Sequence, residues 1–366
     1  MKLGIFDFFQ DIGNFFKGGT VLGIDIGTAS MKAVELTKKG DALRLVNYGV
    51  LATKRYLDYP NQAIQTSSLH IVEKDAAQLL RTLLREMGSR TKLAIASLPV
   101  FSTFTTVLDM PALSKEETAK AIRFQAQQYI PLSPNDVSIE SFHVEDFTSE
   151  RGQKYQRLLL VGVPNEIIAA YKRVYKAAGL TLLSMEIEPF SLLRALKSSF
   201  TEEPVIVADI GAESTSVMVV KQGNIEHVEQ TDYSGVYLTK ALSKSLDISM
   251  TRAEELKCRR GISAAGADAE LSTLLLPFLD VIIQEVKHVE DAYERRTGVR
   301  VGKVMLVGGG ANLIGIEPYF SSQIGLPIAH HSLFLGIGHP PELEPAVKRL
   351  ENELAVACGL AERYFS

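Results

Sequence analysis

Apolar residues in this chain gather in short runs, and two of these runs share the same interruption. Residues 21–36, VLGIDIGTASMKAVEL, start as an apolar run, break at a glycine turn, and continue as a second run. Residues 205–220, VIVADIGAESTSVMVV, repeat this order after the predicted linker TEEP at 201–204. Short apolar runs bounded by turns are typical of buried strands, so each stretch predicts a strand–turn–strand hairpin. The repetition predicts two related α/β halves.

A helix is predicted over 115–129, KEETAKAIRFQAQQY, because apolar residues recur there at the spacing of one helical face. Ser114 and Glu117 have the spacing of a capping box at the start of this helix. The apolar face is expected to consist of Ala119, Ile122, Ala126 and Tyr129.

The N-terminal residues 2–17 have an amphipathic helical pattern with many aromatic side chains. The apolar face comprises Ile5, Phe8, Phe9, Ile12, Phe15 and Phe16, and the polar face comprises Asp7, Gln10, Asp11 and Asn14. Gly4 and Gly13 each weaken such a helix by about 1 kcal/mol, so we expect the segment to become ordered only when docked. Anionic membranes prefer Lys and Arg on the polar face, so a protein surface is favoured over lipid.

Composition and charge narrow the class of protein. With 366 residues, two or more domains are expected, and a net charge of -4 without a basic stripe disfavours a nucleic-acid binder. Residues 274–283, LLLPFLDVII, are too short for a membrane span, which needs roughly 20 apolar residues. No secretory signal is predicted. Cys258 and Cys358 have neither a disulfide nor a metal-site spacing, so we expect two buried, reduced thiols in a cytoplasmic protein.

The two hairpins carry residues suited to a polyphosphate and its metal ion. A glycine turn lets main-chain N–H groups converge on an anion, and hydroxyls and a lysine add donors. Asp25 and Asp209 are predicted to hold Mg²⁺ through water. The nucleotide-binding residues predicted in the hairpins are Asp25, Gly27, Thr28, Ala29, Ser30, Lys32, Asp209, Gly211, Ala212, Glu213, Ser214 and Thr215. A single D-I-G sequence is a common strand-to-turn signal, but two copies in one register favour a ligand.

A third glycine-rich element follows at 303–320, KVMLVGGGANLIGIEPYF, which predicts a strand, a glycine loop, and a helix that opens near Asn312. The loop residues predicted to contact the nucleotide are Gly308, Gly309, Gly310, Ala311 and Leu313. The element also resembles a loose dinucleotide fingerprint, but it does not complete G-x-G-x-x-G and it lies late in the chain. The sequence contains no P-loop motif.

The order of these elements resembles that of the actin-like ATPase superfamily, after residue 20. AEELK at 253–257 resembles the ribose-side helix, and the resemblance implies that Glu254 and Lys257, one turn apart, bind the nucleotide. EPFSLLRAL at 188–196 resembles the first connecting helix, and ELAVACGLAERY at 353–364 resembles the closing helix. The resemblance implies an α/β actin-like ATPase fold of two ribonuclease-H-like halves, with ATP and Mg²⁺ as ligands. Glu188 is the acidic residue placed like a catalytic one, although a helix-start carboxylate favoured by the dipole is an equal alternative.

Within that superfamily the chain resembles the PilM family of type IV pilus assembly proteins, in the FtsA/PilM branch. LGIDIGTASMKAVEL, the block LPVFSTFTTVLDMPALSKEETAKAIRFQAQQYIPLSPNDVSIESFHV, and VGVPNEIIAAYKRVYKAAGL carry the resemblance in that order. The middle block resembles the inserted 1C (SHS2) subdomain of this branch, so 99–164 should form a strand–helix–strand–strand unit outside both main sheets. Family members usually start with a short basic segment, whereas this chain starts with its phenylalanine-rich segment.

The resemblance implies the following division: 1–19, N-terminal segment; 20–98, subdomain 1A; 99–164, subdomain 1C; 165–202, return to 1A and connecting helix; 203–235, subdomain 2A; 236–300, subdomain 2B; 301–366, return to 2A with adenosine loop and closing helix. It also implies a cytoplasmic ATP-binding adaptor, peripheral at the inner face of the inner membrane, that binds the N-terminal tail of a PilN-like protein. ATP hydrolysis should be slow at most, and pilus motor ATPases and a second copy are further expected partners. The alternatives are an FtsA-like polymerising membrane scaffold and a sugar- or acetate-type kinase.

Overall fold

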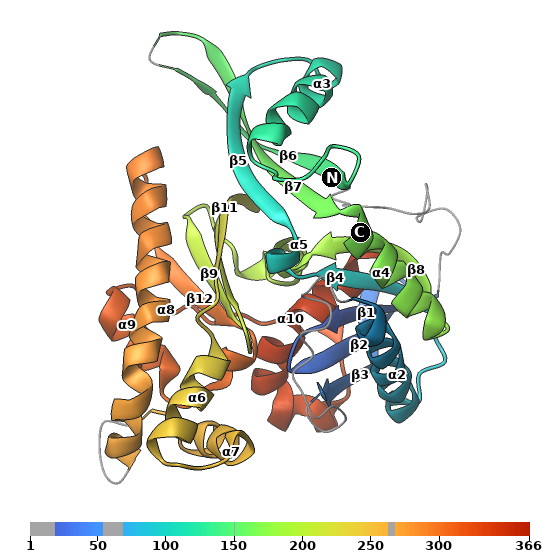
Figure 1. Ribbon diagram of the computed structural model, residues 1–366, viewed down its shortest axis with the longest axis vertical. Helices are drawn as coiled ribbons and strands as arrows, with labels where there is room; N and C mark the ends of the chain where they lie inside the picture. The colour runs from blue at the N-terminus through green and yellow to red at the C-terminus, as the bar shows by residue number, and fades with distance from the viewer. Residues whose placement is uncertain (1–18, 54–68, 150, 263–267) are drawn as a thin grey trace.

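The computed structural model describes residues 19–53, 69–149, 151–262 and 268–366, and the N-terminal helix predicted over 2–17 lies outside these residues. The described strands form three sheets of six, four and three strands, which we call the first, second and third sheet (Figure 1).

Each sheet has a simple strand order. The first sheet consists of β13 (Ile337–Gly338), β3 (Ala42–Ala52), β2 (Ser30–Lys39), β1 (Thr20–Ile26), β4 (Leu93–Leu98) and β8 (Thr181–Ile187). The second consists of β11 (Asn224–Thr231), β10 (Thr215–Lys221), β9 (Val205–Ile210) and β12 (Lys303–Val307). The third consists of β5 (Phe104–Pro111), β7 (Lys154–Pro164) and β6 (Val137–Thr148).

The first and second sheets share one local arrangement. β1 pairs antiparallel with β2 and parallel with β4, while β9 pairs antiparallel with β10 and parallel with β12. Both strand–turn–strand hairpins predicted from the sequence are therefore confirmed. Because each hairpin has its parallel neighbour on the same side, the two turns occupy equivalent places in the two halves.

Each sheet has its own set of helices packed around it. The helices around the first sheet are α2 (Leu69–Met87), α4 (Asn165–Ala177), α5 (Glu188–Ala195) and α10 (Val347–Arg363). The helices of the second half are α6 (Gly235–Ser245), α7 (Met250–Arg260), α8 (Asp268–Thr297) and α9 (Ile316–Ile324). Helix α3 (Lys115–Gln125) packs on the third sheet. Short 3₁₀ turns are η3 (Val100–Ser102), η4 (Ala126–Gln128), η5 (Lys197–Ser199), η6 (Gly309–Asn312) and η7 (Pro341–Ala346). None of the described helices combines the length and apolar content needed to cross a bilayer.

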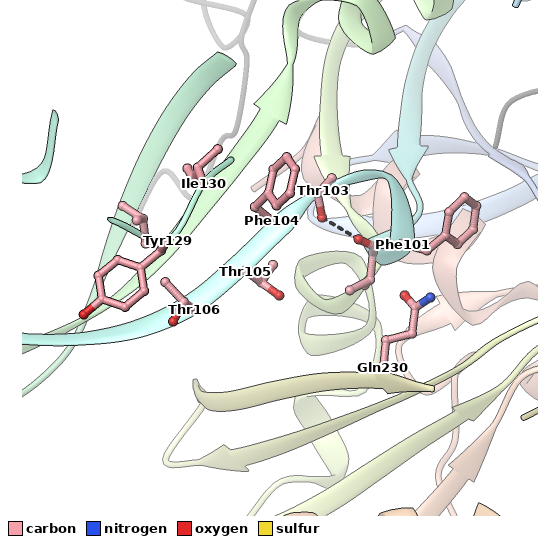
Figure 2. A pocket seen from close by; sticks show the side chains of 10 residues that line it. Phe101, Thr103, Phe104, Thr105, Thr106, Tyr129, Ile130 and Gln230 are labelled. Atoms are coloured by element: carbon pink, nitrogen blue, oxygen red, sulfur yellow. Dashed lines mark hydrogen bonds between the residues drawn. The ribbon is translucent and has the colours of Figure 1, made fainter. Parts of the chain in front are cut away.

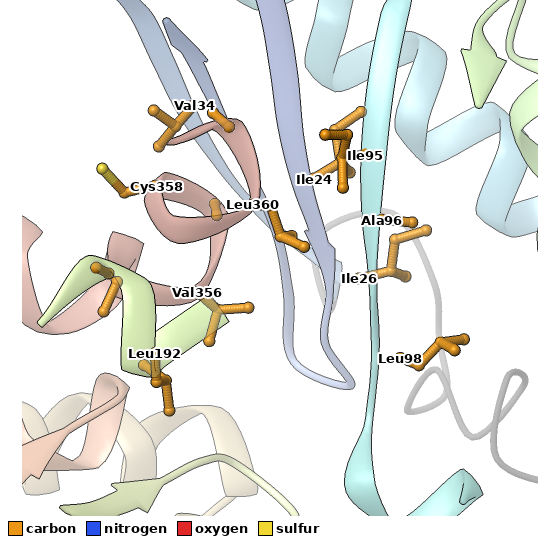
Figure 3. Packing of buried hydrophobic residues seen from close by; sticks show 14 of the residues in the cluster. Ile24, Ile26, Val34, Ile95, Ala96, Leu98, Leu192, Val356, Cys358 and Leu360 are labelled. Atoms are coloured by element: carbon orange, nitrogen blue, oxygen red, sulfur yellow. The ribbon is translucent and has the colours of Figure 1, made fainter. Parts of the chain in front are cut away.

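The closing helix α10 joins the two halves through one hydrophobic core. It packs on β1 and β2, on the connecting helix α5, and on β12 of the second sheet. Gly23 of β1 permits the close approach, because a Cβ there would lie 2.0 Å from the Ala357 carbonyl oxygen. Figure 3 shows Leu192 of α5 and Val356 of α10 side by side in this layer.

The third sheet is a small unit with a core of its own. Its helix α3 begins at the predicted capping box, in which the Ser114 hydroxyl accepts from Glu117 N–H and the Glu117 carboxylate accepts from Ser114 N–H. The buried face of this segment contains Thr118, Ile122 and Ala126. The predicted face was therefore wrong at two positions: Ala119 and Tyr129 are exposed. The α-helix ends at Gln125 and η4 follows, so the helical period no longer holds at Tyr129.

The expectation of two buried thiols is wrong for one of them. Cys358 is fully buried in α10, whereas Cys258 is exposed on α7. α7 turns Ala253 and Lys257 inward, one helical turn apart, and the residue after Lys257 therefore points outward.

Candidate functional site

The glycine turns of the two hairpins have the same hydrogen bond. Gly27 N–H donates to the Ser30 carbonyl oxygen at 3.0 Å, and Gly211 N–H donates to the Ser214 carbonyl oxygen at 2.9 Å. The aspartate of each hairpin lies two residues before its glycine, within the strand that enters the turn. Equivalent turns thus carry equivalent carboxylates in both halves.

Asp25 is buried and has two polar partners. Its side chain accepts from Lys32 Nζ at 3.1 Å and from Ser97 Oγ at 2.8 Å, and Lys32 is the residue opposite Asp25 in the β1–β2 register. These contacts compensate a carboxylate that would be costly to bury alone. Sequence reasoning missed Ser97; its signal was a polar residue near the end of the otherwise apolar strand β4, directly before Leu98 and Pro99.

Asp209 and Glu188 complete a charged cluster with Asp25 and Lys32. Burial raises the pKa of Asp209 to about 6, with Lys32 opposing and Asp25 adding to the rise. Burial, followed by repulsion from Asp25 and Asp209, raises the pKa of Glu188 well above its usual range. Burial lowers the pKa of Lys32, but attraction to the three carboxylates outweighs it and the net shift is upward. The carboxylates of Asp25, Asp209 and Glu188 are thus all within electrostatic range of the Lys32 ammonium group, and Asp25 is the one that contacts it.

Glu188 opens the connecting helix α5, as predicted, and also reaches the start of the third sheet. Ile187 is the N-cap, and Glu188 is the first helical residue. Its carboxylate accepts a hydrogen bond from the main-chain N–H of Val100, in η3. Glu188 therefore links the charged cluster to the turn that leads into β5.

The glycine-rich loop lies against the second carboxylate. Gly308 has φ +83°, and a Cβ there would lie 2.2 Å from Asp209 Oδ1. A Cβ at Gly310 would lie 2.3 Å from Ile210 Cγ2. Only residues without a Cβ allow this packing, so the loop closes over the end of β9. The space beside Gly309 is open.

The segment after the glycines differs from the prediction. The helix expected near Asn312 is instead the 3₁₀ turn η6, and α9 begins at Ile316 after Gly315 in the left-handed conformation. Ala311 and Leu313 are buried in the core of the second half, so their side chains pack there and do not face the loop surface.

The polar side chains of η6 and α10 hold the loop in place. Asn312 Oδ1 accepts from Asn352 Nδ2 at 2.9 Å, and the Asn352 carbonyl accepts from Gly308 N–H at 3.0 Å. The loop position is therefore set by α10 as well as by β12.

Lys257 ties α7 to the start of α6 and to the second turn. Its Nζ contacts the Glu254 carboxylate at 2.8 Å and donates to the Gly235 carbonyl at 3.0 Å and to Thr239 Oγ1 at 2.9 Å. Gly235 N–H in turn donates to the Gly211 carbonyl at 3.1 Å. The ammonium donors are thus used within the fold, and Lys257 positions these elements. Sequence reasoning missed Thr239 and Gly235, whose signal was a glycine at the start of the helical stretch 235–245.

The other residues predicted to bind the nucleotide lie around the two turns. Several of them have polar atoms that form hydrogen bonds within the protein. The carbonyls of Thr28 and Ala29 accept from the Thr53 side chain and main chain, respectively, and the Ala212 carbonyl accepts from Val236 N–H. The Thr215 hydroxyl donates to the Tyr233 carbonyl at 2.7 Å. Glu213 lies in the second turn.

The donor set suits a hydrated cation better than a cage of protein ligands. Within 19–53, 69–149, 151–262 and 268–366, the side chains of His, Cys, Asp and Glu form no group of three arranged to hold a metal ion. A Mg²⁺ ion commonly binds one or two carboxylates, several waters and phosphate oxygens. Asp25 and Asp209 provide carboxylates of that kind next to the two glycine turns.

A pocket of about 280 Å³ lies at the third sheet, where this sheet meets the two halves (Figure 2). One wall comes from η3 and the start of β5, including Phe101 and Thr105. Tyr129 and Ile130, after α3, close one end, and Gln230 of β11 reaches in from the second sheet. Residues from three separate sheets or their loops therefore meet in one cavity.

Comparison with known proteins identifies a family model that matches nearly the whole chain. The model described as "Type IV pilus assembly protein PilM" matches residues 23–365. Among curated proteins, the cell division protein FtsA of Enterococcus faecalis (strain ATCC 700802 / V583) is 24% identical over 373 residues, covering 88% of this chain and 81% of FtsA.

Solved structures with the same architecture confirm the predicted actin-like fold. The structure titled "PilM-PilN type IV pilus biogenesis complex" superposes with a TM-score of 0.79 at 22% identity, covering 94% of this chain and 98% of the matched chain. MreB 5 of Spiroplasma citri bound to AMPPNP gives a TM-score of 0.52 at 14% identity, with 93% and 94% covered.

Proposed function

Because the chain belongs to the PilM family of type IV pilus assembly proteins, we propose that it is a nucleotide-binding adaptor of a pilus assembly complex. In this proposal it binds Mg²⁺-ATP between its two halves and the N-terminal cytoplasmic peptide of a PilN-like membrane protein at the third sheet. The observation that carries the proposal is the pair of equivalent glycine turns, each entered by an aspartate, Asp25 or Asp209, in a strand of equivalent pairing.

The charged cluster and the glycine loop fit a nucleotide with its metal ion. Asp25 and Asp209 would hold the metal through water, and the turns at 27–30 and 211–214 would present main-chain N–H groups to phosphates. The open space beside Gly309 leaves room for the nucleoside against the loop. The fold is compatible with this ligand, since the similar MreB 5 structure is titled as bound to AMPPNP.

The pocket at the third sheet fits a peptide segment better than a large cofactor. Its volume of about 280 Å³ is just below the roughly 300–1,000 Å³ of typical small-molecule sites. Phe101 and Tyr129 line it and remain 36% and 47% exposed, as accessible anchors for apolar side chains. The similar solved structure is titled as a complex of PilM with PilN, which supports a peptide of this kind as the partner.

Two short connections join the proposed nucleotide and peptide sites. Glu188 of the charged cluster accepts from Val100 N–H, and the next residue, Phe101, lines the pocket. In the second half, Ser216 at the start of β10 pairs with Gln230, which also lines the pocket. Closure of the halves over nucleotide would therefore shift both walls, and each ligand would favour the conformation that the other binds best.

Hydrolysis is proposed to be slow. Glu188 is the carboxylate positioned to assist a water molecule, but its raised pKa means that it keeps its proton to higher pH than usual. A carboxyl acts as a general base only in its ionised form, so this shift reduces the fraction of Glu188 that can accept a proton. ATP then acts mainly as a conformational ligand, and membrane association is proposed to come through the PilN-like partner.

An FtsA-like polymerising scaffold is the second candidate, favoured by the 24% identity to FtsA over 88% of this chain. Self-association and binding to pilus motor ATPases are further interactions that we propose for this chain. Sedimentation with Mg²⁺-ATP separates the candidates, because a scaffold should form large assemblies and an adaptor should stay small.

Calorimetry with Mg²⁺-ATP tests the nucleotide part of the proposal. The wild-type protein should bind, and Asp25→Ala or Asp209→Ala should weaken binding at least tenfold, because each removes a ligand to metal-bound water. If the wild-type protein shows no heat of binding and no thermal shift, the nucleotide part is overturned.

A synthetic peptide with the N-terminal sequence of a PilN-like protein tests the peptide part. The Phe101→Ala variant should bind this peptide more weakly than the wild-type protein does. The Phe124→Ala variant should bind it normally, because Phe124 is 71% exposed and lies outside the pocket.

A further inference from the structure

Two adjacent histidines, His330 and His331, follow helix α9 and differ in how far they are buried. The chain that leads to them runs beside β12: Val304 N–H donates to the Pro327 carbonyl at 3.0 Å, and Ala329 N–H donates to the Val304 carbonyl at 2.8 Å. The side chain of His330 is 70% exposed, whereas His331 is half-buried. His331 therefore turns towards the protein, beside the strand that ends in the glycine loop.

His331 contacts Asn352 of the closing helix α10. Its Nε2 lies 2.9 Å from Asn352 Oδ1. Asn352 is buried and holds the glycine loop at two points, because its carbonyl accepts from Gly308 N–H at 3.0 Å and its Nδ2 donates to Asn312 Oδ1 at 2.9 Å. One residue of α10 thus joins His331 to both ends of the loop at 308–312.

The far end of this chain of hydrogen bonds fixes the direction of every bond in it. Asn312 Nδ2 faces the Arg349 carbonyl at 3.3 Å and the Glu353 carboxylate at 3.4 Å, which accept hydrogen bonds. Asn312 therefore presents Oδ1 to Asn352, and Asn352 donates with Nδ2 and presents its own Oδ1 to His331. The ring of His331 must then donate from Nε2. Burial lowers the pKa of His331, so the ring is neutral at pH 7 and carries its one proton on Nε2.

The loop depends on this donor more than the two glycine turns do. Without it, Asn352 Oδ1 loses a partner in a buried place, and the side-chain amide is free to rotate away from Asn312. The turns at 27–30 and 211–214 are each closed by a main-chain hydrogen bond of their own. Loss of the His331 donor should therefore loosen the loop and leave the turns in place.

We propose that His331 is a positioning residue for the nucleoside part of the ligand: its Nε2–H fixes Asn352, and Asn352 fixes the loop at 308–312 against which the nucleoside lies. This inference rests on the proposed nucleotide-binding function and adds the residue that sets the nucleoside side of the site. The phosphates, which the two turns would bind, are outside the influence of His331.

Calorimetry with Mg²⁺-ATP and with Mg²⁺-tripolyphosphate, which has no nucleoside, tests this separation. The His331→Ala variant should bind Mg²⁺-ATP about five- to tenfold more weakly than the wild-type protein and should bind Mg²⁺-tripolyphosphate equally well. His331→Gln should restore ATP binding to within about twofold, because its amide nitrogen can donate from nearly the position of Nε2. His330→Ala is the matched control and should bind both ligands as the wild-type protein does.

Hydrogen exchange of the full chain without ligand gives a second readout. In His331→Ala, exchange at 308–312 should become about five- to tenfold faster, while exchange at 211–214 should match the wild-type protein. If His331→Ala does not fold, His331→Asn takes its place, because the shorter side chain cannot donate from the position of Nε2. His331→Gln should again restore the wild-type exchange.

The outcomes separate this inference from the proposed function. If the wild-type protein binds Mg²⁺-ATP but His331→Ala binds it equally well, or loses affinity for ATP and tripolyphosphate alike, the nucleotide site stands and the positioning role is wrong. Faster exchange at 211–214 as well as at 308–312 would also overturn that role. Where tripolyphosphate binds too weakly to measure, the exchange contrast decides. If the wild-type protein binds neither ligand, the proposed nucleotide binding is wrong and the inference fails with it.

Discussion

Gly308 lies so close to Asp209 that a Cβ on the glycine would be 2.2 Å from the carboxylate oxygen Oδ1. The glycine also has φ +83°, a conformation that residues with a Cβ rarely adopt. The loop after β12 is thus packed directly on a carboxylate proposed to hold the metal. Its neighbour Gly309 meets nothing within 4 Å and provides a matched comparison.

Gly308→Ala should therefore destabilise the protein by about 1–3 kcal/mol, through a strained φ and overpacking against Asp209. Mg²⁺-ATP binding should fall at least tenfold, because the carboxylate must move. Gly309→Ala should change the free energy of unfolding by less than about 0.5 kcal/mol. Urea denaturation and calorimetry on both variants check this, and equal stability losses would contradict the close packing at Gly308.

The raised pKa of Asp209 predicts a pH-dependent stability. The folded-state value is about 6, whereas an unfolded aspartate titrates near about 3.9, so the folded protein holds this proton more tightly between those values. The free energy of unfolding should therefore decrease as pH rises from about 4 to about 6, by about 2–3 kcal/mol from this group. Glu188 is shifted in the same direction and adds to the slope.

Asp209→Asn provides the control for this pH dependence. It cannot ionise, so urea denaturation between pH 4 and pH 6.5 should show a flatter slope than the wild-type protein. The wild-type protein should also bind Mg²⁺-ATP more weakly as pH falls below about 6, since the metal favours the ionised carboxylate. A variant slope equal to that of the wild-type protein would show that Asp209 is not the group responsible.

Sequence reasoning predicts the hairpins well because their information is local and repeated. The D-I-G turn appears twice with the same flanking strands, so both Asp25 and Asp209 could be found without knowing any contact. Glu188 could be placed because the connecting helix follows a strand directly.

Contacts that depend on distant packing were not predictable. Ser97 reaches Asp25 only because β4 pairs beside β1, and Thr239 reaches Lys257 only because α6 packs on α7. Neither residue carries a motif of its own. The inward turn of Lys257, which leaves Cys258 exposed, likewise follows from this packing, because the polar sequence of α7 does not reveal which face is buried.

Neutralising Glu186, which lies in a buried ion cluster, should strongly destabilise the protein. Glu186 is fully buried and accepts from Arg194 at 2.6 and 3.0 Å, from Arg363 at 2.8 Å and from Ser191 at 2.8 Å. Glu186→Gln removes the negative charge between two guanidinium groups, so unfolding should become about 3–5 kcal/mol easier. Glu255→Gln, in an exposed pair with Arg252, should cost less than about 1 kcal/mol. Chemical denaturation of both variants checks this contrast, and similar losses would contradict it.

The exposed thiol of Cys258 offers a test of where the nucleotide lies. Its Sγ is 3.5 Å from Glu254 on the proposed ribose-side helix, and it is within electrostatic range of Glu353 on α10, whose carboxylate also contacts the loop residue Asn312. Partial desolvation raises the pKa of this thiol, and Glu254 raises it further, so alkylation should be slow at neutral pH and faster as pH rises. Cys358 is fully buried and should react only after unfolding.

We expect saturating Mg²⁺-ATP to slow alkylation of Cys258 at least fivefold, because a nucleotide between α7 and the loop would cover the thiol and hold the halves closed. Mass spectrometry after timed iodoacetamide treatment measures the rate at each cysteine. Cys258→Ser should take up no label in the folded state, and full labelling of the wild-type protein in urea should reveal Cys358. If calorimetry shows that Mg²⁺-ATP binds while the Cys258 rate stays unchanged, the nucleotide does not lie beside α7, and the roles proposed for Glu254 and Lys257 would be wrong.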